Sequence, residues 1–340
     1  MKRTMCLIGF VILLAAQMSF AGDLSRVGTV GGTQLLIPVG ARSIALGGGA
    51  VSNITGAEAI YWNPAGLSAG NKSELMFNNM QYIAGIDLNY FALVYNGGNL
   101  GSFGFAIKSL EFGTIEETTA EFPDGTGRTY SPTNVVANFT YARRLTDRIN
   151  AGVTFKYVYE SIMQTSGASI AFDLGVQYAF NSNLRVGVVM KNVGTKMRYD
   201  GRNLETSFQI PGSTPDAETG KFRGVAITTD IPSLFSFGLT YKLNLNEQNS
   251  LSLSGAFSNL NEASDQMYGG VEYNFNNFFF LRGGYTYDIQ LNSDEQLFGA
   301  TFGAGLRYSL GNFDFVFDYA YRDVKDFFDA NQIFTVKLGL

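Results

Sequence analysis

Residues 312–321 read NFDFVFDYAY, and this stretch decides the fold class. Its aromatic residues occupy every second position: Phe313, Phe315, Phe317, Tyr319 and Tyr321. The positions between them are Asp314, Val316, Asp318 and Ala320. Because successive side chains of a β-strand point to opposite faces, one face is wholly aromatic and the other carries two carboxylates. An apolar face of this length is typical of a strand whose outer side meets lipid.

The same alternation recurs in fourteen segments of residues 73–340. A soluble β-sandwich also alternates, but long apolar faces on nearly every strand favour a membrane barrel, in which strands of about 9–11 residues cross at a tilt. In the segment at 296–310 the apolar face is Phe298, Ala300, Phe302, Ala304, Leu306, Tyr308 and Leu310. The expected strands lie at about 73–80, 86–96, 100–110, 133–145, 148–164, 167–181, 184–192, 232–245, 249–259, 264–275, 278–289, 296–310, 312–323 and 330–340.

The lengths of the connections also indicate a barrel. Outer-membrane barrels have short periplasmic turns and longer outer loops. With a periplasmic start, the even connections should be tight, and Thr146-Asp147, Ser182-Asn183 and Asn276-Asn277 suit two-residue hairpins. The two longest connections, roughly 111–132 and 193–231, both fall at odd positions. The sequence therefore predicts an all-β transmembrane antiparallel barrel of about 14 strands in the bacterial outer membrane, with both termini periplasmic and lipid around it.

Composition excludes several other classes of protein. Charged residues make up 16% of the chain, against roughly 25% in an average soluble domain. After the signal region, no run of about 18 apolar residues marks a membrane-spanning helix. The chain has no histidine, which excludes a Ser-His-Asp triad and histidine-ligated zinc. We expect a protein that is not an enzyme, with no catalytic residue, metal or cofactor, and a formal net charge of −5 predicts no nucleic-acid partner.

The N-terminus resembles a cleaved secretory signal peptide. Lys2 and Arg3 precede an apolar stretch at 5–16, and Ser19 and Ala21 are the small residues that signal peptidase reads. Cleavage after Ala21 leaves a mature chain without cysteine. The expected domains are a signal peptide at 1–21, an N-terminal plug at 22–72 and the barrel at 73–340.

The segment at 22–72 is rich in glycine and does not alternate. Residues 41–45 read as a short helical turn, and 62–66 as a turn with Asn63 as cap and Pro64 at the first helical position. Residues 47–49 lack the strand–loop–helix context and the Lys-Ser/Thr of a phosphate-binding loop, so compact packing in the lumen is the better interpretation. The expected plug motif is Gly40, Ala41, Arg42, Leu46, Gly47, Gly48, Trp62, Asn63, Pro64 and Gly66.

Two stretches of this segment carry a family resemblance. Residues 40–48, GARSIALGG, and 58–67, EAIYWNPAGL, resemble the N-terminal signature of the PorV/PorQ family, which belongs with FadL-like outer-membrane proteins. The resemblance implies a fourteen-stranded barrel with an N-terminal plug. It also implies an accessory role in type IX-like protein secretion and surface display, with secreted cargo or secretion components docking on the long outer connections. The FadL-like relationship implies instead passive transport of long-chain fatty acids or other hydrophobic compounds, with a mobile plug and a lateral opening in the wall.

Charged residues of both signs fall on the expected inward face. Such balance argues against a strongly ion-selective pore, and opposite charges would pair across the interior and hold the plug. The main lumen-facing candidates are Lys156, Glu160, Asp173, Lys242, Glu272, Arg282, Arg307, Asp314 and Asp318. Four more inward charges are Lys108, Arg185, Lys191 and Asp288.

Two further expectations concern the loops and the last strand. A pocket for a hydrophobic small molecule would draw on apolar loop positions, although such residues also anchor loops at the membrane surface. The final segment alternates up to the C-terminal Leu340, a pattern that barrel-assembly machinery commonly reads. The apolar loop positions are Phe112, Ile115, Phe122, Phe222, Val225 and Ile227.

Overall fold

The computed structural model describes residues 24–209, 212, 214, 219–325 and 328–340, so the signal peptide predicted at 1–21 lies outside the described residues. The described chain is mostly β-structure, and most of its helical turns lie between Leu24 and Ala69. Within the described ranges, none of the helices is both long and apolar enough to cross a membrane.

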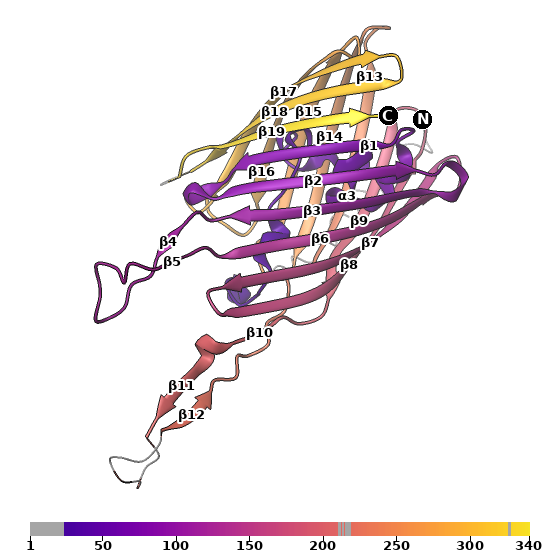
Figure 1. Ribbon diagram of the computed structural model, residues 1–340. Coiled ribbons are helices and arrows are strands. Elements are labelled where there is room, and N and C mark those ends of the chain that lie inside the picture. Colours follow the sequence, from indigo (N-terminus) through magenta and orange to yellow (C-terminus); the bar gives the residue numbers. More distant parts are fainter. Residues whose placement is uncertain (1–23, 210–211, 213, 215–218, 326–327) are drawn as a thin grey trace.

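Fourteen antiparallel strands close into a barrel, which confirms the predicted fold class (Figure 1). The first strand, β1 (Glu74–Gln81), pairs with the last, β19 (Asn331–Gly339), so the ring has no free edge. Between them, in ring order, come β2 (Asp87–Asn96), β3 (Ser102–Glu111), β6 (Thr133–Arg144), β7 (Ile149–Ile162), β8 (Thr165–Ala179), β9 (Leu184–Gly194), β13 (Leu234–Asn244), β14 (Asn249–Leu260), β15 (Gln266–Phe275), β16 (Phe279–Asp288), β17 (Phe298–Leu310) and β18 (Phe313–Val324).

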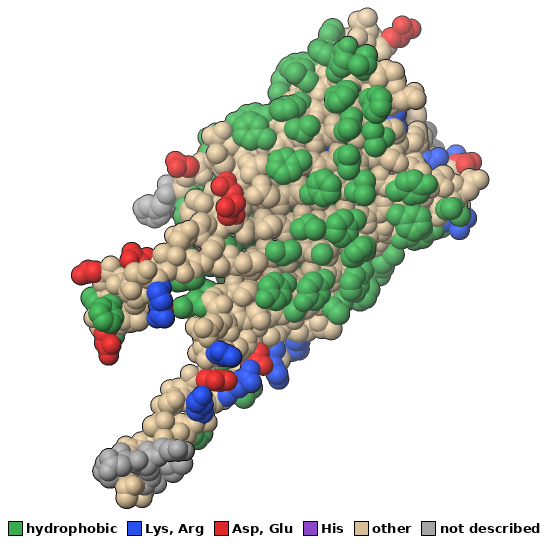
Figure 2. Space-filling view, viewed as in Figure 1, with side chains coloured by type: hydrophobic (Ala, Val, Ile, Leu, Met, Phe, Trp, Pro, Cys, Tyr) green, Lys and Arg blue, Asp and Glu red, His purple; other side chains and the backbone are tan. Residues whose placement is uncertain are grey.

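The outward face of the barrel carries a belt of aromatic and aliphatic side chains (Figure 2). In β18, Phe315 and Phe317 are 46% and 55% exposed, whereas Asp318 is fully buried on the inward face. Water-soluble monomers rarely expose contiguous apolar patches larger than a few hundred Å². The belt therefore has the character of a surface that meets acyl chains, as the alternation at 312–321 predicts.

The long connections lie at one end of the barrel and the tight turns at the other (Figure 1). One long connection carries the hairpin β4 (Ile115–Glu116) and β5 (Thr129–Tyr130). The other carries β10 (Arg198–Gly201), which extends the sheet along β8, and the projecting hairpin β11 (Glu205–Phe208) and β12 (Gly220–Arg223). Leu340 lies at the tight-turn end, where its N–H donates to Ser73 at 2.8 Å.

Residues 24–73, which we call the plug, occupy the inside of the barrel (Figure 1). The plug starts at the long-loop end, where Arg26 pairs with Asp230, and reaches the tight-turn end where β1 begins. That the N-terminus is periplasmic stays a prediction, because the residues before Leu24 lie outside the described part. The plug elements are η1 (Leu24–Arg26), η2 (Thr33–Leu36), α2 (Ala41–Ala45), η3 (Gly49–Ser52), η4 (Gly56–Glu58), α3 (Ala59–Trp62) and η5 (Pro64–Ala69).

Inward-facing glycines let the plug backbone touch the barrel wall. A Cβ added at Gly284 of β16 would lie 2.3 Å from the nitrogen of Gly47. A Cβ at Gly152 of β7 would lie 2.5 Å from the carbonyl carbon of Pro64. The neighbouring Gly283 has no such atom closer than 3.9 Å. Glycine at these wall positions is therefore required by close approach of the plug.

Candidate functional site

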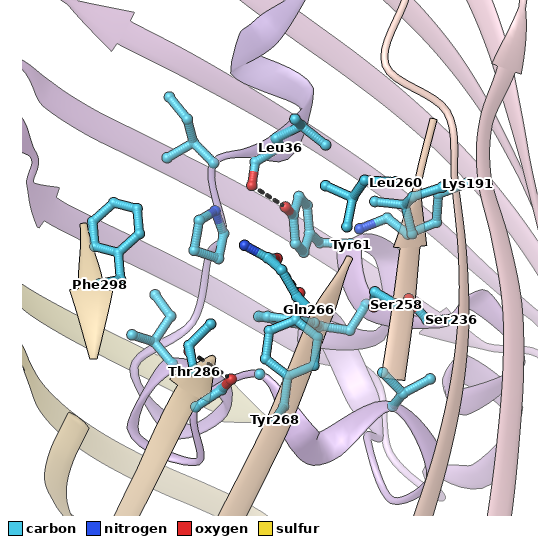
Figure 3. Close-up of a pocket in the computed structure, with 18 of the residues that line it drawn as sticks. Leu36, Tyr61, Lys191, Ser236, Ser258, Leu260, Gln266, Tyr268, Thr286 and Phe298 are labelled. Carbon is cyan, nitrogen blue, oxygen red and sulfur yellow. Dashed lines mark hydrogen bonds between the residues drawn. The ribbon is translucent and has the colours of Figure 1, made fainter. Parts of the chain in front are cut away.

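A cavity of about 330 Å³ lies inside the barrel, between the plug and the strand ends nearest the long loops (Figure 3). This volume is at the lower end of the roughly 300–1,000 Å³ of small-molecule sites. Much of its lining is aliphatic or aromatic: Leu36, Ile37, Pro38, Ile44, Val51, Tyr61, Trp62, Leu234, Leu260, Tyr268 and Phe298. A few polar side chains interrupt this lining, among them Ser236, Ser258, Gln266 and Thr286.

Two cationic side chains line the same cavity, Lys191 of β9 and Arg322 of β18. The Nζ of Lys191 lies 3.6 Å from the ring centroid of Tyr61, and Figure 3 shows its amine directed at that ring. Arg322 stacks at 3.9 Å on Phe298 and donates twice to Asn331. Both cations are at most 6% exposed, and neither forms an ion pair with any described residue. The cavity thus combines apolar walls with positive charge that no carboxylate balances.

The aromatic side of the cavity is fixed by hydrogen bonds within the plug. The Tyr61 hydroxyl donates to the carbonyl of Leu36 at 3.1 Å, and the Trp62 indole donates to that of Val39 at 2.8 Å. The two rings meet edge to face at 5.2 Å. Burial raises the pKa of the Tyr61 hydroxyl, so it remains a neutral donor. These hydrogen bonds hold the Tyr61 ring in the position where the Lys191 amine contacts its face.

A chain of buried charges ties the plug to the opposite wall. Arg42 of α2 donates to Glu272 of β15 at 2.9 and 3.2 Å, and Glu272 also accepts from Arg282 of β16 at 2.8 Å. Arg282 in turn donates to Asp318 of β18 at 2.6 Å. The two positive and two negative charges of this network compensate one another, so the network holds the plug and has no net charge with which to bind an anion.

The barrel ladder is interrupted between β9 and β13. Their pairing stops at Lys191 and Leu234, and in the described part of the chain the backbone pairing between the two sides further on is the isolated bridge from Met197 to Thr229. Asn192 has a left-handed φ of 59° and donates from its amide side chain to the carbonyl of Pro232 at 2.9 Å. We call the interval 192–196 with 230–233 the wall break.

A second cavity of about 450 Å³ opens at the wall break. Its lining includes the lipid-facing Met190 and Val193, and it shares Leu234 with the first cavity. Arg26 of the plug lines it as well and pairs with Asp230 at 3.3 Å and Glu262 at 3.1 Å. Interior and lipid-facing side chains therefore meet at this point of the wall.

Beside the wall break, β7 and β8 hold a buried ion pair. The Nζ of Lys156 lies 2.6 Å from Asp173, and the two side chains are 3% and 0% exposed. Asp173 also accepts from the backbone of Asn192 at 2.8 Å, and Lys156 donates to the Asn192 side chain at 2.7 Å. The pair therefore fixes Asn192, the residue that directly follows the last pair of the β9–β13 ladder.

The plug-motif residues predicted from the sequence all pack inside the lumen, and their contacts differ. The N–H of Gly40 donates to Asn78 at 3.0 Å and that of Ala41 to Thr335 at 2.9 Å, which docks α2 on β1 and β19. Asn63 caps η5 as expected, accepting from Ala65 at 3.2 Å.

The remaining motif residues fit against their neighbours. Leu46 and Gly47 touch the glycines of β15 and β16, Pro64 touches Gly152, and Gly66 packs on the carbonyl of Ile54. Gly47, Gly48 and Trp62 line the first cavity, and Trp62 is the one among these three with a side chain beyond hydrogen.

The predicted lumen charges separate into two groups. Lys156, Asp173, Glu272, Arg282 and Asp318 are buried and paired as described above. Lys242 and Arg307 are exposed at the tight-turn end, and Asp314 pairs with Lys72 at the same end. Glu160 lies near the long loops and accepts a hydrogen bond from the Tyr199 hydroxyl. None of these nine residues lines the first cavity.

Three features of the cavity differ from what the sequence indicates. The alternation at 296–310 predicts Phe298 on the lipid-facing row, but a register shift between Phe298 and Thr301 accompanies its turn into the cavity. The apolar loop positions do not line the cavity: Phe112 packs on the plug core, and Val225 and Ile227 are over 80% exposed. Arg322 is absent from the lumen-facing charges predicted from the sequence, although its place on the inward face of β18 follows from the alternation at 312–321.

Comparison with known proteins identifies the fold. No family model and no curated protein matches the sequence. Among solved structures, the CymD monoaromatic hydrocarbon channel is 12% identical with a TM-score of 0.53, and the match covers 89% of this chain and 97% of that one. The Pseudomonas putida toluene transporter TodX is 13% identical (TM-score 0.53, 93% and 97% covered) and a Pseudomonas aeruginosa FadL homologue 14% (0.52, 89% and 98%). The chain therefore has the barrel fold of FadL-like channels.

Proposed function

We propose that this protein is a passive outer-membrane channel for small hydrophobic compounds, and that it prefers those carrying an acidic group. The observation that carries the proposal is the plugged, largely apolar cavity with the unpaired cations Lys191 and Arg322. Structures of the same fold include hydrocarbon channels, which supports the hydrophobic part of the proposal. The preference for an acid rests on the cations alone.

The charge balance of the cavity favours an anion for a physical reason. A buried cation without a partner loses its hydration and gains no Coulombic compensation. Among the described residues, the Lys191 amine contacts the rings of Tyr61 and Trp62, which replace a small part of that hydration. A ligand carboxylate beside Lys191 or Arg322 would neutralise that charge, while its apolar part would cover Leu36, Leu260 or Phe298.

The shape of the interior also supports a route. The plug fills the direct path along the barrel axis, because its backbone touches wall glycines such as Gly152 and Gly284. Leu234, which lies directly opposite Lys191 in the β9–β13 ladder, lines both cavities. We propose that a ligand enters from the long-loop end, binds in the first cavity and leaves sideways through the wall break when Arg26 moves aside.

Binding can be measured through the one tryptophan of the chain, Trp62, which lines the cavity. Its fluorescence is titrated with decanoate and, separately, with toluene in detergent. The variant Lys191→Met keeps the apolar stem and removes the charge. Because a hydrogen bond to a charged group contributes about 1.5–3 kcal/mol, decanoate should bind roughly 10- to 100-fold more weakly, with toluene binding unchanged. Lys242→Met, at an exposed residue of the tight-turn end, is the matched control.

The outcomes separate the two parts of the proposal. Equal decanoate affinity in Lys191→Met and wild type contradicts the acid preference. No fluorescence response to either compound, together with no uptake of them by cells that carry the wild-type protein, contradicts the channel function itself.

The projecting hairpins favour a second candidate function, an accessory role in protein secretion. Phe122, Phe222, Val225 and Ile227 are exposed on the long connections, outside the barrel belt, and such side chains suit a protein partner. The PorV/PorQ resemblance of the plug points the same way. Deleting residues 203–224 tests it: loss of surface-displayed cargo with unchanged decanoate binding supports the secretion role, and unchanged display contradicts it.

A further inference from the structure

Basic side chains gather on the outer wall where β10 leaves the barrel (Figure 2). Arg198 of β10 lies directly opposite Ala168 of β8, and cross-strand partners share a face of the sheet. Ala168 is exposed on the outward face, so Arg198 also points outward. The next outward residues along β8 are Ile170 and Phe172, which are 39% and 46% exposed. With a rise of about 3.3 Å per residue, Arg198 stands about 7 Å beyond the start of an apolar row.

A second cation, Arg202, lies beside exposed apolar side chains of the turn between β7 and β8. The backbone of Arg202 donates to the carbonyl of Gln164 at 3.1 Å, which fixes Arg202 beside the turn between β7 and β8. That turn exposes Ile162 and Met163 at 48% and 45%. Lys221 and Arg223 share one face of β12, and Arg223 contacts Asp200, which shares the outward face with Arg198. The hairpin therefore adds its cations to the same side.

Ion pairing leaves several of these cations free. Asp200 is engaged by Arg223, and Asp230 is engaged by Arg26 and Lys196. In the part of the chain that the structure describes, the cations without an ion pair in this region are Arg198, Arg202 and Lys221, and the carboxylates without one are Glu205 and Glu160, which accepts from Tyr199. All three cations are exposed. The surface thus presents uncompensated positive charge directly above lipid-facing side chains.

We propose that this surface binds the phosphate groups of a phosphorylated glycolipid of the lipid A type in the outer leaflet. The ligand chemistry follows from the order of the side chains: acyl chains lie along Ile170 and Phe172, and the phosphates meet Arg198 and Arg202. The arginine guanidinium suits phosphate because its planar fork donates two parallel hydrogen bonds. The proposal requires that the long loops lie outside the cell. In the opposite orientation, the same surface would face the phospholipid headgroups of the inner leaflet.

The test uses full-length protein in nanodiscs and native mass spectrometry. The protein is loaded with bisphosphorylated lipid A, with the same lipid lacking both phosphates, or with phosphatidylglycerol, and apparent affinities are taken from the bound populations. The variant is Arg198→Gln with Arg202→Gln, and the control is Arg148→Gln at an exposed residue of the tight-turn end. Since a basic residue near a membrane surface contributes about 1 kcal/mol, the double variant should bind lipid A about 10- to 30-fold more weakly.

Wild type and Arg148→Gln should bind lipid A alike, and both should bind the dephosphorylated lipid at least tenfold more weakly. Heat-shifted gel mobility of all variants verifies that each barrel is closed. Unchanged lipid A affinity in the double variant overturns the proposal, as does equal affinity for the dephosphorylated lipid. Equal affinity for phosphatidylglycerol overturns the assignment to an outer-leaflet glycolipid.

Discussion

Replacing Gly284 by alanine tests how tightly the plug is held. The added Cβ would lie 2.3 Å from the nitrogen of Gly47 and 2.4 Å from the carbonyl carbon of Leu46, whereas ordinary contact begins at 3.4 Å. Both atoms are backbone, so the plug must retreat by about 1 Å, and overpacking of this kind costs about 1–3 kcal/mol. The same retreat weakens the bonds from Thr286 to Gly47 at 3.1 Å and from Thr301 to Ala45 at 3.0 Å, each contributing about 1 kcal/mol.

The expected loss of plug docking is therefore about 2–4 kcal/mol, which raises the population of a displaced plug by roughly 30- to 1,000-fold. Conductance in planar bilayers should show frequent openings, and the temperature at which gel mobility shifts should fall. The control is Gly283→Ala on the outward face of the same strand, where the nearest atom is 3.9 Å away. Identical conductance and identical transition temperatures for the two variants would refute the argument that the wall glycines hold the plug.

Three further predictions concern buried groups. Asp173→Asn leaves the Lys156 charge unpaired and should destabilise the barrel by about 3–5 kcal/mol in urea unfolding, whereas Lys156→Met with Asp173→Leu should recover most of this loss. Burial raises the pKa of Tyr61, so the neutral hydroxyl contributes to the free energy of unfolding below about pH 10, and this contribution is lost as the pH rises toward the pKa of Tyr61 in the folded protein. In Tyr61→Phe, the free energy of unfolding should therefore depend less on pH between about pH 10 and 12. Arg42→Met leaves Glu272 with Arg282 as its remaining partner and should lower the plug-release temperature without opening the β-ring, as measured by proteolysis of residues 24–73.

The strands are predictable from the sequence because alternation is a local property. In β18 the aromatic and acidic positions separate within ten residues, and the expected span 312–323 agrees with Phe313–Val324 to one residue at each end. At β13 the expected span 232–245 differs from Leu234–Asn244 by two residues at the start and one at the end. The long connections are predictable for the same reason, since loss of alternation marks them.

The cavity is not predictable in this way because it depends on register and on the path of the plug. Lys191 is recognisable as inward-facing, but its contact with Tyr61 exists only because the plug carries that ring across the lumen to β9. The bulge that turns Phe298 inward leaves no mark in a sequence that continues to alternate. Likewise Arg42 belongs to a recognisable motif, whereas its partner Glu272 is set by strand order around the ring.

The last strand both completes the ring and receives the plug, since β19 pairs with β1 while Thr335 accepts from Ala41 and Lys337 pairs with Glu58 at 3.0 Å. The plug, which is translated before the barrel, is thus anchored by the strand that is translated last. A growing polypeptide cannot secure its N-terminal segment until translation has ended, and such non-local contacts slow folding. Assembly in the cell must accordingly keep residues 24–73 unaggregated and in place until the final hairpin arrives, and a chain that ends before Asn331 would have an open seam and an unanchored plug at once.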